Sequence, residues 1–290
     1  MSRSLLAALE KLRESHTGSL PASVLSSAQR RSLESFAQTT KSVQMRPSGR
    51  GVVFAIINSE VVDKHWRELS PVDLMELDRT LPNRAKNIAI ARSSKSQDHL
   101  HDVHYLLLKA GKGSVTWVDD AGHRLDLREM TDQQGAAAFA IRENNSWATD
   151  GVLWLVENQA LFDRLEWLPN ELNTSVAYYS GNLRNSFLEW LAAKPRAATI
   201  WFFPDYDGVG LMNYARIKAC LGNKVHFWLM PEWKTKLTRL GNDTLWKDTF
   251  RDFQAAQGRL ANLQIERELL TLMQSMQIHG LALEQEAIWL

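Results

Sequence analysis

The sequence has little cysteine and no long apolar run. Cys220 is the single cysteine among 290 residues, which excludes a disulfide framework and a zinc site built from several thiolates. No stretch approaches the roughly 18 apolar residues of a membrane-spanning helix. Charged residues interrupt the apolar positions of the amino-terminal segment, unlike the core of a secretory signal. These absences favour a cytoplasmic protein of globular composition without a membrane partner.

The net charge is also small. The chain carries 34 Lys and Arg against 33 Asp and Glu, a formal charge of +1, which excludes a surface uniformly coated in positive potential. The charge is uneven, because residues 1–50 hold eight basic and three acidic side chains. Eight of the 11 Trp residues lie beyond residue 150. We therefore expect two or more domains, with the main boundary near Asp150-Gly151.

Residues 1–65 show the pattern of a small helical domain that ends in a hairpin. Leucines at positions 5, 6, 9 and 12 have helical spacing, a short helix can begin at Pro21, and Ser26 or Ser27 can cap a third helix that ends near residue 40. Two β-rich runs within residues 43–57 flank a Pro-Ser-Gly-Arg-Gly turn. Three short helices followed by a basic hairpin are typical of a winged-helix DNA-binding domain.

In that arrangement the third helix would enter the major groove and the hairpin would contact phosphate. The candidate DNA-binding residues are Arg30 and Arg31 on the helix and Arg46 and Arg50 on the hairpin. The alternative is a small helical domain whose arginines are only solvated.

The middle region, residues 66–148, indicates a basic α+β segment. A helix is expected over residues 70–81, and a hairpin is expected from residues 103–110 and 114–120. Further candidate phosphate contacts, or else a solvated face, are Arg84, Lys86, Arg92 and Lys95. The spacing of His99, His101 and His104 does not put all three on one helical face, which argues against a metal site there.

Residues 149–290 alternate apolar strands with helices, which predicts a parallel sheet covered by helices. Glu157 follows the first of these strands, and Asp205 and Asp207 follow the third. Because parallel strands end at the same edge of a sheet, we expect the three carboxylates to converge there. Such a cluster is costly unless a hard divalent cation compensates the repulsion. The alternative is that the two aspartates only form a turn.

At these positions the sequence resembles a known fold. The segments LWLVEN, YYSG and IWFFPDYDGVG resemble the Toprim domain shared by type II topoisomerases, primases and certain nucleases. Together with the winged-helix-like amino half and the closing LEQEAIWL, they resemble the nuclease subunit of the Wadjet/Mks plasmid-defence systems, which is related to the topoisomerase VI A subunit. The resemblance implies a Toprim domain over residues 149–290.

The resemblance also implies an activity and a site. Glu157, Asp205 and Asp207 would be catalytic and would bind Mg²⁺ or Mn²⁺, with Glu157 as a ligand or general acid/base. Glu286 is a weaker candidate, and the alternative for it is a solvated helix end. The chain would be a homodimeric, metal-dependent endonuclease for double-stranded DNA. It would cut DNA held across both halves, as the cleavage subunit of an anti-plasmid SMC-kleisin complex.

The topoisomerase relatives break DNA through a tyrosine in the winged-helix half, but residues 1–104 contain no Tyr. Tyr105 lies in an apolar, strand-like run and is expected to be packed. We therefore expect hydrolysis by a metal-activated water. Two alternatives stay open: a non-catalytic DNA-binding or adaptor protein on a degenerate Toprim scaffold, and a topoisomerase-like transesterase.

Overall fold

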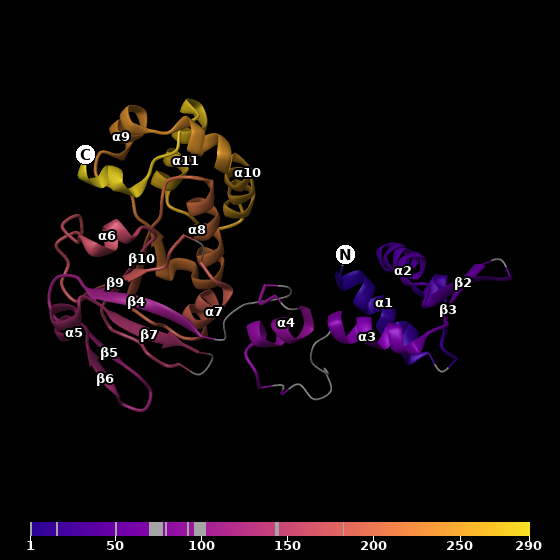
Figure 1. Ribbon diagram of the computed structural model, residues 1–290. Helices are drawn as coiled ribbons and strands as arrows, with labels where there is room; N and C mark the ends of the chain where they lie inside the picture. Colours follow the sequence, from indigo (N-terminus) through magenta and orange to yellow (C-terminus); the bar gives the residue numbers. More distant parts are fainter. Residues whose placement is uncertain are drawn as a thin grey trace. The chain divides into compact units, whose positions relative to one another are not determined.

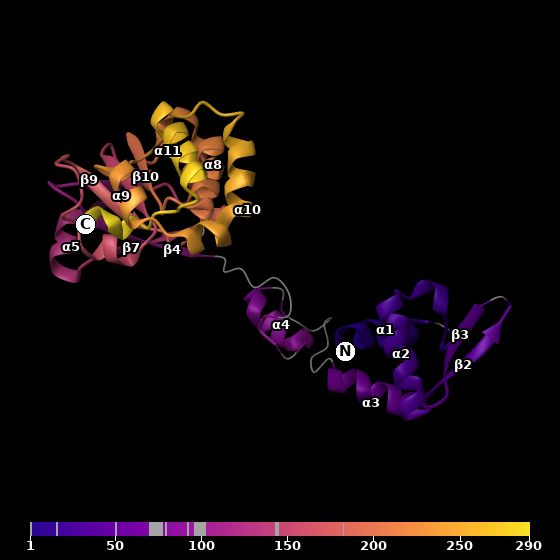
Figure 2. The same cartoon turned by 90° about the horizontal axis from the view of Figure 1, so that it is seen from above.

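The computed structural model describes residues 2–15, 17–49, 51–69, 78, 80–91, 93–95, 103–142, 145–181 and 183–290. The chain forms two compact units, Met1–Asp102 and Val103–Leu290, hereafter unit 1 and unit 2. Figures 1 and 2 show the helices and strands of both units in two orientations. Among the described residues, no helix is long and apolar enough to cross a bilayer.

Unit 1 combines helices with a small antiparallel sheet. Its strands pair in the order β1-β3-β2, and its core contains Leu9, Leu33 and Phe54. The elements are α1 (Ser2–Glu14), β1 (Ser19–Pro21), the 3-10 turn η1 (Ala22–Val24), α2 (Ser27–Thr40), β2 (Val43–Ser48), β3 (Gly51–Ile56), α3 (Ser59–Leu69) and α4 (Asn83–Ala91).

Local sequence signals in unit 1 predict most of these elements. Helices α1 and α2 and the β2–β3 hairpin lie where the sequence placed them. Ser26 caps α2 by accepting a hydrogen bond from the Gln29 N–H, and the Gln29 side chain returns a bond to the Ser26 N–H. Helix α3 crosses the expected domain end at residue 65 and buries Val62 in the core of unit 1. The helix expected over residues 70–81 lies outside the described residues, except for residues 78, 80 and 81.

Unit 2 is built on a mixed six-stranded sheet of order β11-β10-β8-β9-β4-β7. The first four strands in this order are parallel, whereas β4 is antiparallel to both β9 and β7. The strands are β4 (His104–Ala110), β5 (Thr116–Val118), β6 (Arg124–Asp126), β7 (Ala137–Ile141), β8 (Val152–Val156), β9 (Thr174–Tyr178), β10 (Thr199–Phe203) and β11 (Val225–Phe227). The helices are α5 (Leu127–Gln134), α6 (Gln159–Asp163), α7 (Asn185–Ala193), α8 (Gly208–Leu221), α9 (Trp233–Leu240), α10 (Asp243–Leu260) and α11 (Arg267–His279), with 3-10 turns η2 (Gly222–Lys224) and η3 (Gln285–Trp289).

The sheet differs from the sequence-based expectation in two respects. The expectation of a hairpin over residues 103–120 is wrong, because β4 pairs with β7 and β9 while β5 pairs with β6. The compact units divide the chain after Asp102 rather than near Asp150-Gly151. The reason is that β4 and β7 complete the sheet begun by β8–β11, so residues 103–290 share one core. Alternating apolar residues indicate a strand but not its partner.

Aromatic side chains fill much of this core. Trp154 on β8 is buried, and its ring centroid lies 5.5 Å from Trp167, 5.7 Å from Trp201 and 5.2 Å from Trp228. Offset and edge-to-face aromatic pairs add to the stability that area burial provides. These Trp residues therefore belong to the core.

Two glycines at the start of α8 permit close packing of the backbone. A Cβ on Gly208 would lie 1.9 Å from the Thr249 carbonyl oxygen on α10, and one on Gly210 would lie 2.1 Å from the Asp205 carbonyl oxygen. Gly208 thus lets the first turn of α8 contact the backbone of α10. In contrast, a Cβ on Gly258 of α10 would meet open space.

We expect Gly208→Ala to lower the free energy of unfolding of unit 2 by about 1–3 kcal/mol or more, because the added methyl group overlaps the α10 backbone. The matched control is Gly258→Ala, which should raise stability by up to about 1 kcal/mol through higher helix propensity. Chemical denaturation followed by Trp fluorescence measures both. Equal stability of Gly208→Ala and the wild type would contradict the close α8–α10 approach.

Candidate active site

The structure brings the three predicted carboxylates to one edge of the sheet. Strands β8 and β10 are parallel neighbours, with Val156 opposite Phe203, so Glu157 and Asp205 leave the sheet at the same end. Glu157 Oε2 accepts a hydrogen bond of 3.3 Å from the Asp205 N–H. Asp207 then caps α8, and its Oδ1 accepts a hydrogen bond of 2.7 Å from the Gly210 N–H. Neighbouring strands and one helix N-terminus thus position the cluster.

Tyr179, which the sequence analysis did not select, holds Glu157 in place. Its hydroxyl donates a hydrogen bond of 3.0 Å to Glu157 Oε2, and its buried ring stacks on Phe202. Burial, aided by the Glu157 charge, raises the pKa of Tyr179 well above its ordinary value. Tyr179 therefore remains a protonated donor. The only sequence signal was its place directly after a buried strand.

The C-terminal segment closes over the ends of β8 and β10. The Gln285 side chain is fully buried, donates to the Phe203 carbonyl oxygen and accepts a 2.9 Å hydrogen bond from the Asn158 N–H. The Gln285 N–H donates a 2.7 Å bond to Asp205 Oδ1. Gln285 is thus a site residue that the sequence analysis missed, since nothing in its local sequence indicates burial at a strand end.

Glu286 also reaches the cluster. Its Oε1 accepts a hydrogen bond from the Asn158 side-chain amide, and its side chain is half-buried. Its charge raises the pKa values of both Glu157 and Asp205. The structure therefore places Glu286 beside the carboxylates, rather than at the solvated helix end that was the alternative for it. Figure 1 shows the C-terminal segment in yellow at this end of unit 2.

The carboxylates hold protons more tightly than usual. Burial raises the pKa of Asp205 to about 8; the Gln285 hydrogen bond opposes this shift, and the neighbouring acids reinforce it. Burial, opposed by the Tyr179 hydrogen bond and reinforced by Asp207, raises the pKa of Glu157 to about 7. Burial also raises the pKa of Asp207. The cluster would therefore be stabilised by an added positive charge.

The donor chemistry fits a hard divalent cation. All members of the cluster offer carboxylate oxygens, which suit Mg²⁺ and Mn²⁺. In the described part of the chain, no three His, Cys, Asp or Glu side chains are already positioned to hold a metal. Mg²⁺ needs only one or two protein carboxylates, because it keeps several waters and takes phosphate oxygens from the substrate. Glu157, Asp205 and Asp207 offer carboxylates of the kind that such a site would use.

The predicted DNA-binding residues that the structure describes all lie in unit 1. Arg30, Arg31, Arg46 and Lys95 are exposed, whereas Arg84 and Lys86 are half-buried. Arg50 and Arg92 lie outside the described residues, as do His99 and His101. Exposure of the arginines on α2 and β2 leaves them accessible to phosphate, although Arg30 also pairs with Glu34 at 2.8 Å.

His104 and Tyr105 begin β4 and have different environments. His104 is half-buried, packs against Phe187, and has its pKa lowered by burial and by the nearby Arg184 charge. Tyr105 is 63% exposed, so the expectation that it is packed is wrong. Leu106 and Leu108 on one face of β4 are buried in the core of unit 2, and Tyr105 lies on the other face.

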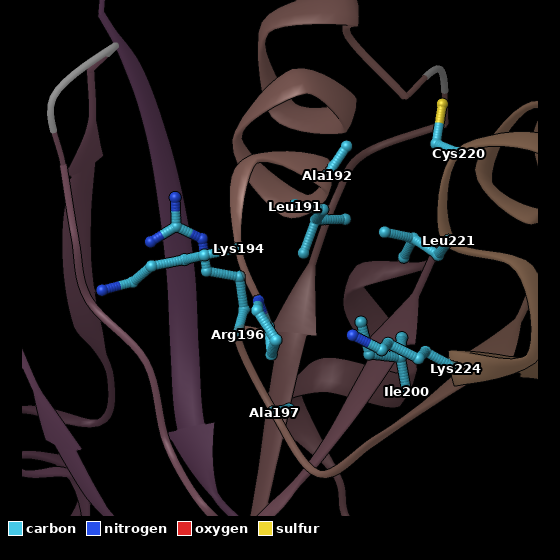
Figure 3. Close-up of a pocket in the computed structure, with 10 residues that line it drawn as sticks. Leu191, Ala192, Lys194, Arg196, Ala197, Ile200, Cys220, Leu221 and Lys224 are labelled. Carbon is cyan, nitrogen blue, oxygen red and sulfur yellow. The ribbon is translucent and has the colours of Figure 1, made fainter.

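A small hollow of about 110 Å³ lies at the opposite edge of the sheet, where β10 and β11 begin. Figure 3 shows its lining, with the side chains of Lys194 and Arg196 directed away from Cys220. Lys194 pairs with Asp120, and Arg196 donates to the Trp190 and Trp147 carbonyl oxygens. The protein itself therefore engages both of these cations.

We expect Asp205→Asn to stabilise the metal-free protein. With a pKa of about 8 in the folded state against an ordinary value of 3.8, the native carboxyl keeps a proton that the unfolded chain releases. The Asp205 contribution to stability is thus present below about pH 4 and lost as the pH rises towards 8. Asn removes this loss, which is about 1.4 kcal/mol for each pH unit between the two pKa values, so at pH 7 the variant should be up to about 4 kcal/mol more stable.

Denaturation of wild type and variant from pH 4 to pH 8 in EDTA measures the difference. The control is Asp150→Asn, which changes an exposed acid at the other edge of the sheet. A stability difference between Asp205→Asn and wild type that does not grow with pH would contradict the raised pKa.

We expect Gln285→Ala to lower the free energy of unfolding by about 3 kcal/mol, because it leaves the Asn158 N–H and the Phe203 carbonyl oxygen without their buried partner. The matched control is Gln277→Ala, which changes an exposed glutamine on α11. Urea titration compares the two variants, and a loss no larger than that of Gln277→Ala would show that Gln285 does not anchor the segment.

Comparison with known proteins assigns a family but no activity. Residues 124–289, more than half of the chain, match a family described as a domain of unknown function, DUF7281. No curated protein matches the sequence. The matched residues include β7–β11, all of the carboxylates and Gln285. The chain therefore belongs to the DUF7281 family.

Proposed function

We propose that the protein is a metal-dependent DNA endonuclease that uses Mg²⁺ or Mn²⁺. The observation that carries the proposal is the convergence of half-buried Glu157 and Asp205 with buried Asp207 at the ends of two neighbouring parallel strands. Their raised pKa values mean that the protein gives up stability to keep the acids together. That loss is offset when a cation and a phosphodiester occupy the site.

In this mechanism the chain's own residues orient the carboxylates and move a proton. Tyr179 fixes one oxygen of Glu157, and the pKa of about 7 lets that carboxyl take or return a proton near neutral pH. Gln285 fixes one oxygen of Asp205. Glu157, Asp205 and Asp207 would hold the cation. When bound, the cation would activate water for attack on phosphorus and stabilise the leaving oxygen.

The proposal extends to the fold families and partners. We assign unit 2 to the Toprim fold and unit 1 to a winged-helix arrangement, with exposed Arg30, Arg31 and Arg46 as contacts to double-stranded DNA. The resemblance to the Wadjet/Mks nuclease subunit supports a homodimer that cuts plasmid DNA within a cytoplasmic SMC-kleisin complex. In this proposal the acids of unit 2 cleave DNA and the arginines of unit 1 bind it.

We expect Glu157→Gln, Asp205→Asn and Asp207→Asn each to reduce Mn²⁺-dependent plasmid cleavage at least about 100-fold, because each removes negative charge that would hold the cation. Agarose electrophoresis of supercoiled plasmid, with and without partner complex, measures the rate. Asp150→Asn is the control and should cleave like the wild type. If Asp207→Asn cuts as fast as the wild type, the site assignment is wrong.

A second readout does not depend on the partner complex. Mn²⁺ should raise the thermal unfolding temperature of the wild type and of Asp150→Asn, and should raise it little in Asp205→Asn. Absence of both the cation-induced shift and cleavage in the wild type would indicate the non-catalytic adaptor. A covalent protein–DNA adduct trapped in denaturant would indicate transesterification.

A further inference from the structure

One face of the sheet around β4 and β7 carries apolar side chains that are open to solvent. Tyr105 is 63% exposed and Leu107 is 38% exposed, and Ala138 opposite Leu107 is exposed as well. Residues of these strands that point to the other face, such as Leu106 and Phe139, are buried. A strand with one wet face normally alternates apolar with polar residues. Here both faces are largely apolar, which is typical of a binding surface.

Strand register carries this open face towards the carboxylates. Tyr178 on β9 lies opposite Leu107 on one side and opposite Val156 on the other, one residue before Glu157. Since β4 runs antiparallel to β9, Tyr105 lies two residues beyond Leu107 in the direction of the carboxyl edge. Tyr105 and Tyr178 therefore lie towards the carboxyl edge of the sheet, at which Glu157 and Asp205 follow their strands.

A hollow of about 310 Å³ adjoins this face. Its lining combines the rings of Phe162 and Tyr178, whose centroids are 5.9 Å apart, with Leu107, Lys109 and the amides Gln134 and Gln159. Flat apolar walls with amide groups at the rim suit a planar heterocycle that also forms hydrogen bonds. The volume lies at the lower end of ligand pockets, about 300–1,000 Å³.

A positive charge borders the open face. Arg142 follows β7 and is exposed, and strand alternation places it on the same face as Ala138. Lys109 lies 4.9 Å from the Phe162 ring centroid, and its charge is already paired with the Asp163 carboxylate at 3.8 Å. Aromatic rings bordered by an arginine match the bases and a phosphate of a nucleic-acid strand.

We propose that Tyr105, Leu107, Tyr178 and the adjoining hollow, together called the base platform, bind an unpaired DNA strand beside the carboxylates. Bases in a duplex are stacked on each other, so an exposed tyrosine can stack only on a base that has left the helix. The choice of DNA rests on the proposed endonuclease function. The base platform would hold the bases of one strand while its sugar-phosphate chain passes along the carboxyl edge.

The test measures binding in EDTA, where cleavage does not occur. Fluorescence anisotropy of the full chain with a labelled dT oligonucleotide and with a blunt duplex should show that Tyr105→Ala weakens binding of the single strand at least about fivefold and leaves duplex binding unchanged. Tyr105→Phe keeps the ring and should bind like the wild type. Ile278→Ala, which removes an exposed apolar side chain from α11, is the matched control.

Three outcomes would overturn the base platform. Unchanged single-strand binding by Tyr105→Ala would show that Tyr105 does not contact the bases. An equal loss of affinity for the single strand and the duplex would show that Tyr105 contacts the DNA backbone instead. A change in oligomeric state of Tyr105→Ala in size-exclusion chromatography would show that the face binds a second copy of the chain.

The base platform and the endonuclease proposal can fail separately. Loss of single-strand binding in Tyr105→Ala, combined with wild-type cleavage by Asp205→Asn, would support the base platform and contradict the nuclease site. Loss of cleavage in Tyr105→Phe, together with normal single-strand binding, would make the hydroxyl a nucleophile and overturn hydrolysis.

Discussion

Gln285 joins parts of the chain that are far apart in sequence. Its side chain spans the ends of β8 and β10 through Asn158 and Phe203, and its N–H fixes Asp205. Pairing of Tyr206 with Leu283 holds the same segment against the turn after β10. Without these bonds the strand ends would expose unpaired polar groups next to three acids. The geometry of the carboxylates thus depends on a residue that carries no charge.

Ionising the anchored carboxyls costs free energy, because they are removed from water. The hydrogen bonds from Tyr179, Gln285 and Gly210 each favour the ionised form of a carboxyl, while burial opposes it more strongly. In the described part of the chain, burial, hydrogen bonds and neighbouring acids set these pKa values, so the bound cation that we propose would lower the free-energy cost of ionising the cluster. Stability is lost there because the acids are kept together, as is common at functional sites.

The position of the carboxylates could be predicted because parallel strands of one sheet end at the same edge. Glu157 and Asp205 follow apolar runs that were expected to be such strands, and the structure shows that the two strands are also neighbours. The sequence could not predict Gln285 or Tyr179, since their roles depend on partners 82 and 22 residues away. It also missed the pairing of β4, because an apolar strand is compatible with several partners.

The region that matches the family is shorter than the unit that folds. The match begins at residue 124, within β6, whereas β4 ends at Ala110 and lies between β9 and β7 in the sheet. Removing β4 would leave both neighbouring strands with an unpaired edge and would uncover the core around Phe139. The carboxylates therefore need residues 103–290 as a scaffold, and the strand that completes this scaffold is also the one that carries Tyr105.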